Sequence, residues 1–536
     1  MSKTKKILLS LSFIIALLCC HNASYAQRNV ILVIADDLGS DYCGFNENHL
    51  DTIPMPNIRR LLSRGVRFRN AWTNPVCSPT RAGLLTGRYS FRTGVGSAIG
   101  GAGSAVLDTA EMTIPKLLNR FKPNGIAKGH IGKWHLQLPM PITNYQFPNK
   151  MGYDHFEGGF TGELTSFYNW TKVTNGVASN STNYATTENV NNAWKWVKAQ
   201  GNKQFFLWLA FNAPHIPHHL PPAGLHPYKT LSGTATDIAA NPKSYFKASV
   251  ATLDHELGRL FDSLQVYKQW ENTDIIFIGD NGNEATTAQR TGGAKGSVYE
   301  QGLSVPFIIS GPSVVNPGRS SEALVDTHDL FATILELFGY TNWQSQIAVN
   351  KPVDSKSIMP IIKNTSTTIR TYNFSEVFKG PNASADGKTM RNAQYKLIDF
   401  DNGTQRLYNL LTDPLESIDL LTKPMTAEAT TNYNTLCTEI ANLVGKSGCA
   451  KTVSIVLANE VEINNKEPSI YPNPFTDYIN IDNVKGDEIF QLTNSLGISV
   501  YNGRGIKNQD FSNLPVGVYI LEIKGKEITK YKLVKY

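Results

Sequence analysis

The feature that most constrains the fold is an apolar run that recurs along the chain and ends each time in polar side chains. The first run, "NVILVIADD" (29–37), is continuously apolar and closes on two aspartates. A run of this length without alternation is typical of a strand that is buried on both faces. Three later segments follow the same design: "GIAKGHIGKWH" (125–135), "KQFFLWLAFNAPH" (203–215) and "TDIIFIGDNGNE" (273–284).

Helical patterns lie between these runs, for example at 56–65 and 244–264. Alternating strands and helices predict an α/β fold with a mostly parallel sheet between helices. In such sheets, ligands bind at the carboxyl ends of the strands. We therefore expect the polar residues that end the four runs to meet at one edge of the sheet: residues 36–37, 133–135, 215 and 280–281.

The start of the chain differs from this body. Residues 1–26 carry a lysine-rich beginning, an apolar stretch and the small-residue pattern "SYA", which together predict a signal peptide. The "LLCC" within this stretch leaves a lipoprotein cysteine as the alternative. No later segment is long and apolar enough to predict a membrane span.

Pattern changes divide the rest of the chain into four parts. Residues 27–350 carry the α/β pattern. Residues 351–450 are expected to form a small antiparallel subdomain, because "QYKLIDFDNGTQRLYNLL" predicts two strands around an Asn-Gly turn. Residues 451–468 predict a linker. Short alternating strands with Pro, Gly and Asn turns in residues 469–536 predict a separate all-β sandwich.

The charge balance argues against nucleic acid as a partner. The 536 residues contain 51 Lys and Arg against 44 Asp and Glu, a formal net charge of +7, and no basic block occurs. Cys437 and Cys449 lie close enough in sequence for a local disulfide, which export would permit. Cys43 and Cys77 have no such neighbour.

Cys77 begins the string "CSPTRAGLLTGR". A lone cysteine is most often a small buried hydrophobe. This string, however, resembles the full signature of the type I sulfatases, with five positions in register: Cys77, Pro79, Arg81, Gly87 and Arg88. The resemblance implies that a formylglycine-generating or an anaerobic sulfatase-maturating enzyme converts Cys77 to 3-oxoalanine (formylglycine). The hydrated aldehyde of that group attacks sulfur. Pro79 suits a helix start, and a helix N-terminus favours a bound anion such as sulfate.

Asp36 and Asp37 at the end of the first run, with Asp280 and Asn281 at the end of the fourth, form an oxygen-rich set. Adjacent acids at a strand end are often only a turn or a helix cap, which is the alternative. Oxygen ligands without a thiolate favour Ca²⁺ or Mg²⁺ over zinc. The resemblance implies a single Ca²⁺ held by these four side chains and the modified Cys77.

Two further segments match the same family: "GKWH" (132–135) and "RTGGAKGSVYEQGLSVPF" (290–307). The resemblance implies that Lys133 and Lys295 bind the sulfate. It also implies that His135 contacts the formylglycine hydroxyl and takes the proton whose removal releases sulfate.

The resemblance places His215, which ends "NAPH", against the sulfate, and Arg81 beside the diol. Either His215 or a protonated Asp280 would protonate the leaving alcohol, and the sequence does not choose between them. His218 and His219 follow in "HIPHHLPP". We expect one of them at the substrate rim, with a zinc site built from the three histidines as the alternative.

The end of the chain carries "YPNPF" (471–475), "LPVGVYIL" (514–521) and the basic terminus "KYKLVKY". These motifs resemble the C-terminal sorting domain of the Bacteroidetes type IX secretion system. The resemblance implies transport across an outer membrane by that machinery and a secreted or cell-surface location. A carbohydrate-binding or adhesion module is the alternative.

The resemblance implies a sulfuric ester hydrolase with an alkaline-phosphatase-like sulfatase fold, in line with the α/β pattern of the sequence. An exported enzyme meets polymers and oligomers outside the cell, so we expect a sulfated polysaccharide or oligosaccharide of the ulvan, carrageenan or fucoidan type. Sugar stacking is expected in the loops 96–108 and 157–190, which carry Phe167, Tyr168, Trp170 and Tyr184.

Two other classes of protein stay open. A phosphatase or phosphodiesterase of the same superfamily would normally use Ser or Thr as nucleophile, with extra His and Asp ligands for two zinc ions. A non-catalytic glycan-binding protein would not need Cys77 at all. The motifs also leave a phosphonate or sulfonate substrate open.

Overall fold

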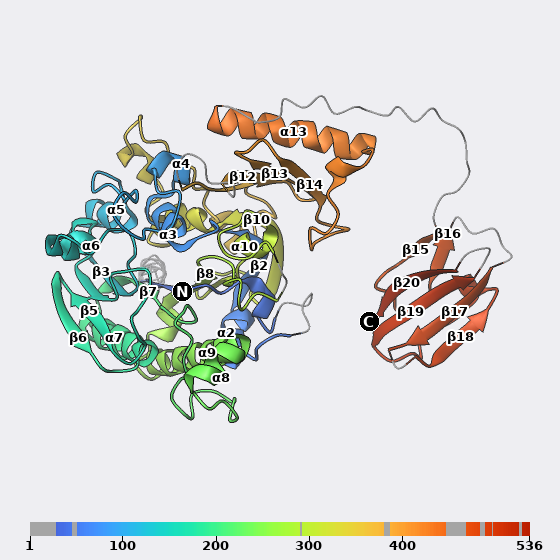
Figure 1. Cartoon of the computed structure of the whole chain (residues 1–536), viewed down its shortest axis with the longest axis horizontal. Helices are drawn as coiled ribbons and strands as arrows, with labels where there is room; N and C mark the ends of the chain where they lie inside the picture. Colours follow the sequence, from blue (N-terminus) through green and yellow to red (C-terminus); the bar gives the residue numbers. More distant parts are fainter. Residues whose placement is uncertain are drawn as a thin grey trace, which may run out of the picture. The chain divides into compact units, whose positions relative to one another are not determined.

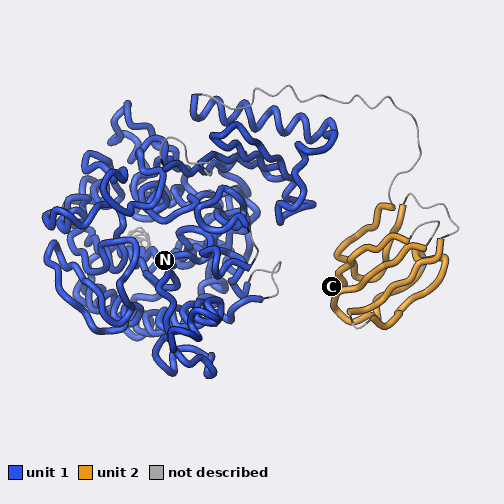
Figure 2. Tube along the Cα trace, viewed as in Figure 1, with its two compact units in different colours: residues 1–455 blue, residues 456–536 orange. Residues whose placement is uncertain are grey.

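The computed structural model describes residues 28–45, 51–289, 292–379, 386–445, 468–482, 488–495, 497–524 and 528–536. The chain forms two compact units, Met1–Ile455 and Val456–Tyr536 (Figure 2). The predicted signal peptide, nearly all of the predicted linker and Cys449 lie outside the described residues. Cys437 is disulfide-bonded, and its pairing with Cys449 stays a prediction.

The first unit is built on a ten-stranded sheet with the order β10-β2-β9-β8-β1-β7-β3-β4-β5-β6 (Figure 1). The strands are β1 (Asn29–Ala35), β2 (Gly65–Trp72), β3 (Ile126–Gly132), β4 (His155–Gly158), β5 (Trp170–Thr174), β6 (Val177–Ser181), β7 (Gln204–Ala210), β8 (Thr273–Gly279), β9 (Phe307–Ser310) and β10 (Arg319–Asp326).

The centre of this sheet is parallel. Strands β8, β1, β7, β3 and β4 all run in one direction, and β10 pairs with β2 in parallel as well. Strand β9 runs antiparallel to both of its neighbours, and β5 and β6 continue the other edge in antiparallel fashion. The predicted α/β fold with a mostly parallel sheet is therefore confirmed.

Helices cover both faces because the central strands are apolar on both sides. In β1, Val30, Leu32 and Ile34 point into one core, while Ile31 and Val33 point into the other. Period-two alternation accounts for this division. Helices α3 (Cys77–Thr86), α5 (Ile114–Phe121) and α11 (Leu330–Leu337) line the first core, and α2 (Pro56–Ser63), α7 (Ala185–Gln200) and α9 (Pro242–Val266) line the second.

Shorter elements complete the first unit. They are η1 (Ser40–Tyr42), α4 (Ser90–Thr93), η2 (Ile142–Gln146), α6 (Phe147–Lys150), α8 (Ala235–Ala240), η3 (Trp270–Asn272), α10 (Glu300–Leu303), η4 (Thr327–Asp329), η5 (Trp343–Gln346), α12 (Met359–Ile362) and η6 (Leu420–Thr422).

A smaller antiparallel sheet follows in the chain, with the order β11-β12-β13-β14. Its strands are β11 (Asn373–Val377), β12 (Gly387–Arg391), β13 (Tyr395–Phe400) and β14 (Gln405–Asn409), and α13 (Ala427–Val444) packs against it. The strands β13 and β14 form the hairpin that the Asn-Gly turn predicts.

The second unit is all-β, as predicted. It contains a two-stranded sheet, β15 (Ser469–Tyr471) with β16 (Asn480–Asp482), and a four-stranded sheet of β18 (Ser499–Gly503), β17 (Ile489–Asn494), β19 (Gly517–Lys524) and β20 (Ile528–Lys535), with η7 (Ile506–Asn508) between β18 and β19. Apolar residues from both sheets share one core. Within the described residues, no helix of either unit is long and apolar enough to cross a bilayer.

Candidate active site

The polar residues that follow the four central strands lie together, as the sequence predicts. Asp36 follows β1, Lys133 follows β3 and Asp280 follows β8. Backbone hydrogen bonds continue the sheet register past these ends: the amide of Lys133 donates to Ala210 at 2.7 Å and the amide of Asp280 donates to Ala35 at 3.2 Å. The side chains are therefore placed by the sheet itself.

Cys77 is the first residue of α3, and its side chain is buried. Pro79 lies in the first turn, where its missing N–H costs nothing. The helix ends at Gly87, whose φ of 71° is left-handed, and a side chain there would collide with Phe331. Cys77 therefore presents its sulfur at the positive end of a short, fixed helix. The Sγ of Cys77 lies 3.1 Å from Nδ1 of His135.

Arg81 lies one helical turn beyond Cys77 and binds a carboxylate. Its Nη2 and Nε donate to Oδ2 of Asp280 at 2.7 and 3.2 Å, and its Nη1 donates to the carbonyl of Lys133 at 2.9 Å. Burial alone would lower the pKa of Arg81, but Asp280 and Asp36 raise it, so the guanidinium stays charged. The guanidinium thus bonds to Asp280 and Lys133, and its contact with the diol stays a prediction.

Three buried carboxylates share the site with Asn281. The side-chain amide of Asn281 donates to Oδ1 of Asp37 at 2.6 Å, and the backbone amide of Asp37 donates to Oδ1 of Asp280 at 3.0 Å. Burial, followed by the charge of Asp280, raises the pKa of Asp36 well above its usual value. Burial also acts to raise the pKa of Asp37, but His215 and Lys295 lower it.

The two lysines face these carboxylates. Nζ of Lys133 is 2.5 Å from Oδ2 of Asp36, and both side chains are fully buried. Nζ of Lys295 is 2.8 Å from Oδ2 of Asp37 and 3.3 Å from Oε1 of Glu284. With Arg81, the lysines place three cationic side chains against the acidic side chains of the site.

Two oxygens of the site have no hydrogen-bond partner. They are Oδ1 of Asp36 and Oδ1 of Asn281, both buried. A buried acceptor without a donor is costly, so such atoms point to a missing ligand. Carboxylate and amide oxygens are the ligands of a hard divalent cation. The donor set therefore fits the predicted metal.

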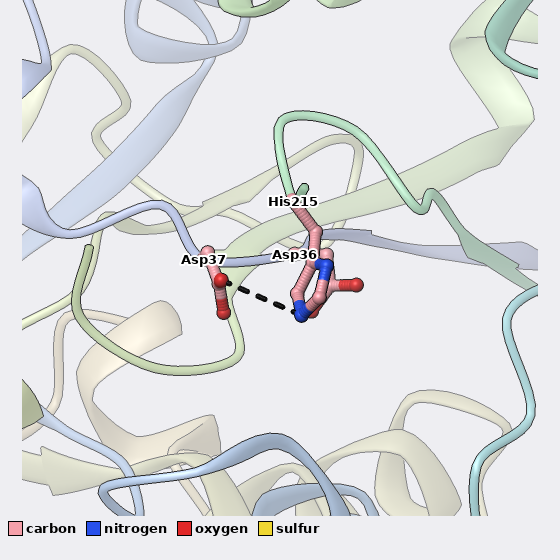
Figure 3. Close-up of side chains that lie close together, drawn as sticks. All are labelled: Asp36, Asp37 and His215. Carbon is pink, nitrogen blue, oxygen red and sulfur yellow. Dashed lines mark ion pairs between the residues drawn. The ribbon is translucent and has the colours of Figure 1, made fainter. Parts of the chain in front are cut away.

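His215 lies in the same cluster. The sequence predicted contact of His215 with the sulfate and gave no sign that it could also bind the metal. Asp36, Asp37 and His215 form the only group of its kind in the described part of the chain, with potential ligand atoms all within 4.8 Å of one another (Figure 3). Nε2 of His215 is 3.6 Å from Oδ2 of Asp37. Burial lowers the pKa of His215 to about 4, although Asp37 opposes this shift.

Two residues of the site have left-handed backbones. The φ of Asp37 is 62° and that of His135 is 56°. A residue other than glycine adopts this conformation only when its surroundings hold it there, and such positions cluster at functional sites. The backbone amide of His135 donates to Phe160 at 3.1 Å, and its imidazole Nε2 lies 2.8 Å from the carbonyl of Ile99.

The three histidines of "HIPHH" do not form a zinc site in the described structure. His219 uses both ring nitrogens: Nδ1 lies 2.9 Å from the carbonyl of Pro217, and Nε2 lies 3.0 Å from the hydroxyl of Tyr184. Its ring also stacks on Phe167 at 4.0 Å between centroids. His218 differs, because its buried Nε2 has no partner. His219 therefore supports the loop, and His218 is the one with a free polar atom.

The expectation of sugar stacking was wrong for three of the four aromatic residues. Phe167, Trp170 and Tyr184 are buried in the second core, where a sugar cannot reach them. Trp170 donates its indole N–H to a backbone carbonyl, that of Asn183, at 3.1 Å. Only Tyr168 is exposed among the four, at 40%. The sequence shows that a loop is aromatic, whereas packing decides which rings face solvent.

Sequence reasoning also missed residues that hold the site from behind. The hydroxyls of Thr80 and Thr73 donate to the backbone carbonyl of Asp280 at 2.7 and 3.0 Å. Thr80 lies inside the "CSPTRAGLLTGR" signature, so its position alone could have marked it as a site residue. Its role depends on a contact across 200 residues, which no local pattern reveals.

Comparison with known proteins adds three family matches. The model described as "Sulfatase" matches residues 28–340, and the one described as "N-sulphoglucosamine sulphohydrolase, C-terminal" matches residues 294–443. A third, described as "Secretion system C-terminal sorting domain", matches residues 469–535.

Curated relatives share about a quarter of their aligned residues with the chain. Arylsulfatase J of Mus musculus is 26% identical over 337 residues, which cover 59% of the chain and 53% of the relative. An arylsulfatase of Klebsiella aerogenes is 24% identical over 442 residues, covering 64% and 92%. N-acetylgalactosamine-6-sulfatase of Homo sapiens is 27% identical over 370 residues, covering 62% and 65%. The chain thus spans about half the length of the mouse relative.

Solved structures share the fold. The crystal structure of Ps i-CgsB in complex with k-i-k-neocarrahexaose aligns with a TM-score of 0.64 and 26% identity, covering 78% of the chain and 92% of that structure. The PsFucS1 sulfatase from Pseudoalteromonas sp. aligns with a TM-score of 0.62 and 20% identity, covering 83% and 95%.

Proposed function

Because the chain belongs to the sulfatase family, whose model matches residues 28–340 of 536, we propose that it hydrolyses sulfate esters of a carbohydrate. The observation that carries the proposal is the place of Cys77. It opens a complete signature, begins a helix and faces the imidazole of His135 at 3.1 Å. A purely structural cysteine would need none of these.

The proposal includes conversion of Cys77 to 3-oxoalanine by a formylglycine-generating or an anaerobic sulfatase-maturating enzyme. Once present, the hydrated aldehyde supplies an oxygen nucleophile for sulfur. The Sγ of Cys77 marks where that oxygen would lie. Nε2 of His135 must donate its hydrogen to the carbonyl of Ile99, which can only accept. The lone pair of Nδ1 therefore faces residue 77 and can accept a proton there.

The proposal also includes one Ca²⁺, held by Asp36, Asp37, Asp280, Asn281 and the modified residue 77. When bound, such an ion polarises the nucleophile and the sulfate oxygens. The unpartnered oxygens of Asp36 and Asn281 support this assignment.

We assign the binding of sulfate to the two lysines of the site. In the structure, Lys133 forms an ion pair with Asp36, and Lys295 forms one with Asp37. With those carboxylates turned to a metal, both ammonium groups are free to bind the sulfate oxygens and the charge that develops on them. Arg81 keeps its place on Asp280, and so positions a metal ligand.

The leaving alcohol needs a proton, and the contacts of Asp280 leave His215 as its source, provided that the bound sulfate raises the pKa of His215 from about 4. Both carboxylate oxygens of Asp280 are already occupied, Oδ1 by the amide of Asp37 and Oδ2 by Arg81. The side chain of His215 is 9% exposed, so one edge of the imidazole reaches toward solvent, where a substrate would enter.

We further propose a sulfated algal polysaccharide, or its oligosaccharides, as the substrate class, of the carrageenan, ulvan or fucoidan type. The match to a sorting domain over residues 469–535 supports a secreted or cell-surface location, reached through a signal peptide and the type IX secretion machinery. The likeness to a structure holding k-i-k-neocarrahexaose makes carrageenan oligosaccharides the first to test.

The deciding experiment measures inorganic sulfate released from a panel of algal and animal polysaccharides and from an aryl sulfate. Wild-type protein should release sulfate, and Cys77→Ala should not, with an unchanged melting temperature. Mass spectrometry of the Cys77 peptide should show 3-oxoalanine. Active protein with an unmodified thiol would overturn the mechanism.

Two outcomes would favour the other classes of protein. Faster release of phosphate from an aryl phosphate would indicate a phosphatase or phosphodiesterase. Binding of a polysaccharide that Cys77→Ala retains, with no sulfate released by either protein, would indicate a glycan-binding protein.

A further inference from the structure

The imidazole of His135 is held at both of its ring nitrogens. Nδ1 meets the sulfur of Cys77 at 3.1 Å, and Nε2 meets the carbonyl of Ile99 at 2.8 Å. The face of the ring lies against Gly162, where any added Cβ would overlap the ring atoms. The ring therefore has one orientation, and the surrounding residues determine which one.

One hydroxyl connects the parts of this arrangement. Oγ of Ser78 donates to the backbone carbonyl of His135 at 2.9 Å. The same oxygen accepts a hydrogen bond from the backbone amide of Ile99 at 3.1 Å. Ser78 is fully buried, so water cannot replace it. A single side chain thus ties His135 to the residue whose carbonyl orients its ring.

This connection matters because His135 is under backbone strain. Its φ of 56° is costly for a residue other than glycine, and the local hydrogen bonds must offset that cost. Ile99 needs support as well. It is a buried anchor, while residues 100–103 directly after it are exposed. Without Ser78, the amide of Ile99 and the carbonyl of His135 would both lose a partner.

We propose that Ser78 is a positioning residue that, with the backbone carbonyl of Ile99, holds the imidazole of His135 against residue 77. The proposal rests on the sulfatase function proposed above, because only that function gives the imidazole a proton to move. Hydrogen-bond partners behind a reactive imidazole fix its tautomer and its direction. Ser78 is adjacent in sequence to residue 77, yet its hydroxyl bonds to His135, which follows the strand β3.

The first test replaces Ser78 with alanine. We expect kcat to fall about 10- to 100-fold, the range typical of lost outer-layer partners, with KM unchanged within about twofold. Rates are divided by the fraction of protein that carries 3-oxoalanine, measured by mass spectrometry, because the change lies inside the modification signature. Thr86→Ala is the matched control: it removes another buried hydroxyl of α3, one that bonds only to Ala82 within the helix.

The second test is a double-mutant cycle with His135→Ala. If Ser78 acts through His135, Ser78→Ala should cause no further loss in the His135→Ala background. Independent losses that multiply would overturn the proposal and leave Ser78 as a purely structural residue. A His135→Ala variant as active as the wild type would instead overturn the role of His135 in the proposed function, so the two failures are distinct.

A third variant approaches the same ring from its other side. Gly162→Ala should lower kcat and the melting temperature of the wild type, because its methyl group displaces the imidazole. In the His135→Ala background the same change should leave the melting temperature unaltered. An equal drop in both backgrounds would show that Gly162 is needed for its backbone and not for the ring.

Discussion

Two buried clusters of charge lie next to helix α3, and they differ in how fully their acceptor oxygens are hydrogen-bonded. The first is the active-site cluster of Asp36, Asp37, Asp280, Arg81, Lys133 and Lys295. The second, here called the η4 cluster, consists of Asp326, His328, Asp329 and Arg370. Both are buried, and both pair acids with bases.

The carboxylates of the η4 cluster have their hydrogen-bond donors. Oδ1 of Asp329 accepts from the amide of Lys356 at 2.8 Å and from Arg370, and Oδ2 accepts from the amide of Asp326 at 2.9 Å. Nδ1 of His328 lies 2.7 Å from Asp326. The active-site cluster, in contrast, leaves one oxygen of Asp36 and one of Asn281 without a donor. Buried charge is therefore common to both clusters, and unmet acceptor oxygens set the active-site cluster apart from the η4 cluster.

The sharpest way to break this comparison is to remove a charge from the first cluster. Asp36→Asn should lower sulfate release about 10⁴-fold, or about 5 kcal/mol of transition-state stabilisation, because a metal ligand is lost. Rates are compared per folded protein, because the substitution also removes the carboxylate partner of the fully buried Lys133. Activity within tenfold of wild type would contradict the assignment.

The opposite pattern is expected for the second cluster. Arg370→Met leaves the buried carboxylate of Asp329 without its arginine partner, which costs about 3–5 kcal/mol of unfolding free energy. Burial alone would lower the pKa of Arg370, but Asp329 raises it above its ordinary value, so the native state depends on the charge. Denaturant unfolding measures the loss, and the specific activity of the folded fraction should be preserved. A stable but inactive variant would remove the distinction between the clusters.

A buried acid outside both clusters, Glu376, makes the stability of the protein depend on pH. Glu376 accepts from the amide of Phe91 at 2.7 Å, and burial raises its pKa to about 7. Lys388 opposes this shift, while Asp354 and Asp401 add to it. Because the folded pKa exceeds the unfolded one, the folded state retains the proton that the unfolded state releases. Stability therefore falls as pH rises from about 4.5 to 7 and stays lower above that.

Glu376→Gln should abolish this dependence, which amounts to about 3 kcal/mol between pH 4.5 and 7.5. Thermal unfolding of both proteins across that range is the measurement. Parallel curves for variant and wild type would show that Glu376 is ionised throughout.

The smallest effect concerns the metal. Ca²⁺ at about 100 times its Kd should stabilise the protein by about 3 kcal/mol, and a chelator should reverse this. Asp36→Asn should lose the shift, whereas Arg370→Met should keep it. A shift of equal size in Asp36→Asn would place the ion elsewhere.

Much of the fold and the outline of the site can be predicted from sequence. The run that ends in Asp36 and Asp37 has to be a buried strand, because its residues are apolar on both faces. Once four such strands lie parallel, their ends must meet. The polar ends are therefore brought together by topology, which the pattern reveals.

Side-chain partners could not be predicted in the same way. The ion pair of Lys133 with Asp36 and that of Arg81 with Asp280 follow from no local pattern. The expected contacts of these two residues with the sulfate and the diol stay predictions. Phe167 and Trp170 were expected on the surface, yet they fill the second core. Each of these contacts is one of several that a flexible side chain could make. The partners lie far apart in the sequence, so a local pattern does not reveal them.

The open glycines beside Ile99 have a practical consequence for protein engineering. Gly100 and Gly101 have negative or extended backbones and no atom within 4 Å of an added Cβ, so side chains can be introduced there without repacking the core. The segment is joined to the imidazole of His135 through a single carbonyl. A library built at these two positions would vary the exposed surface next to Ile99 while leaving the reactive groups in place.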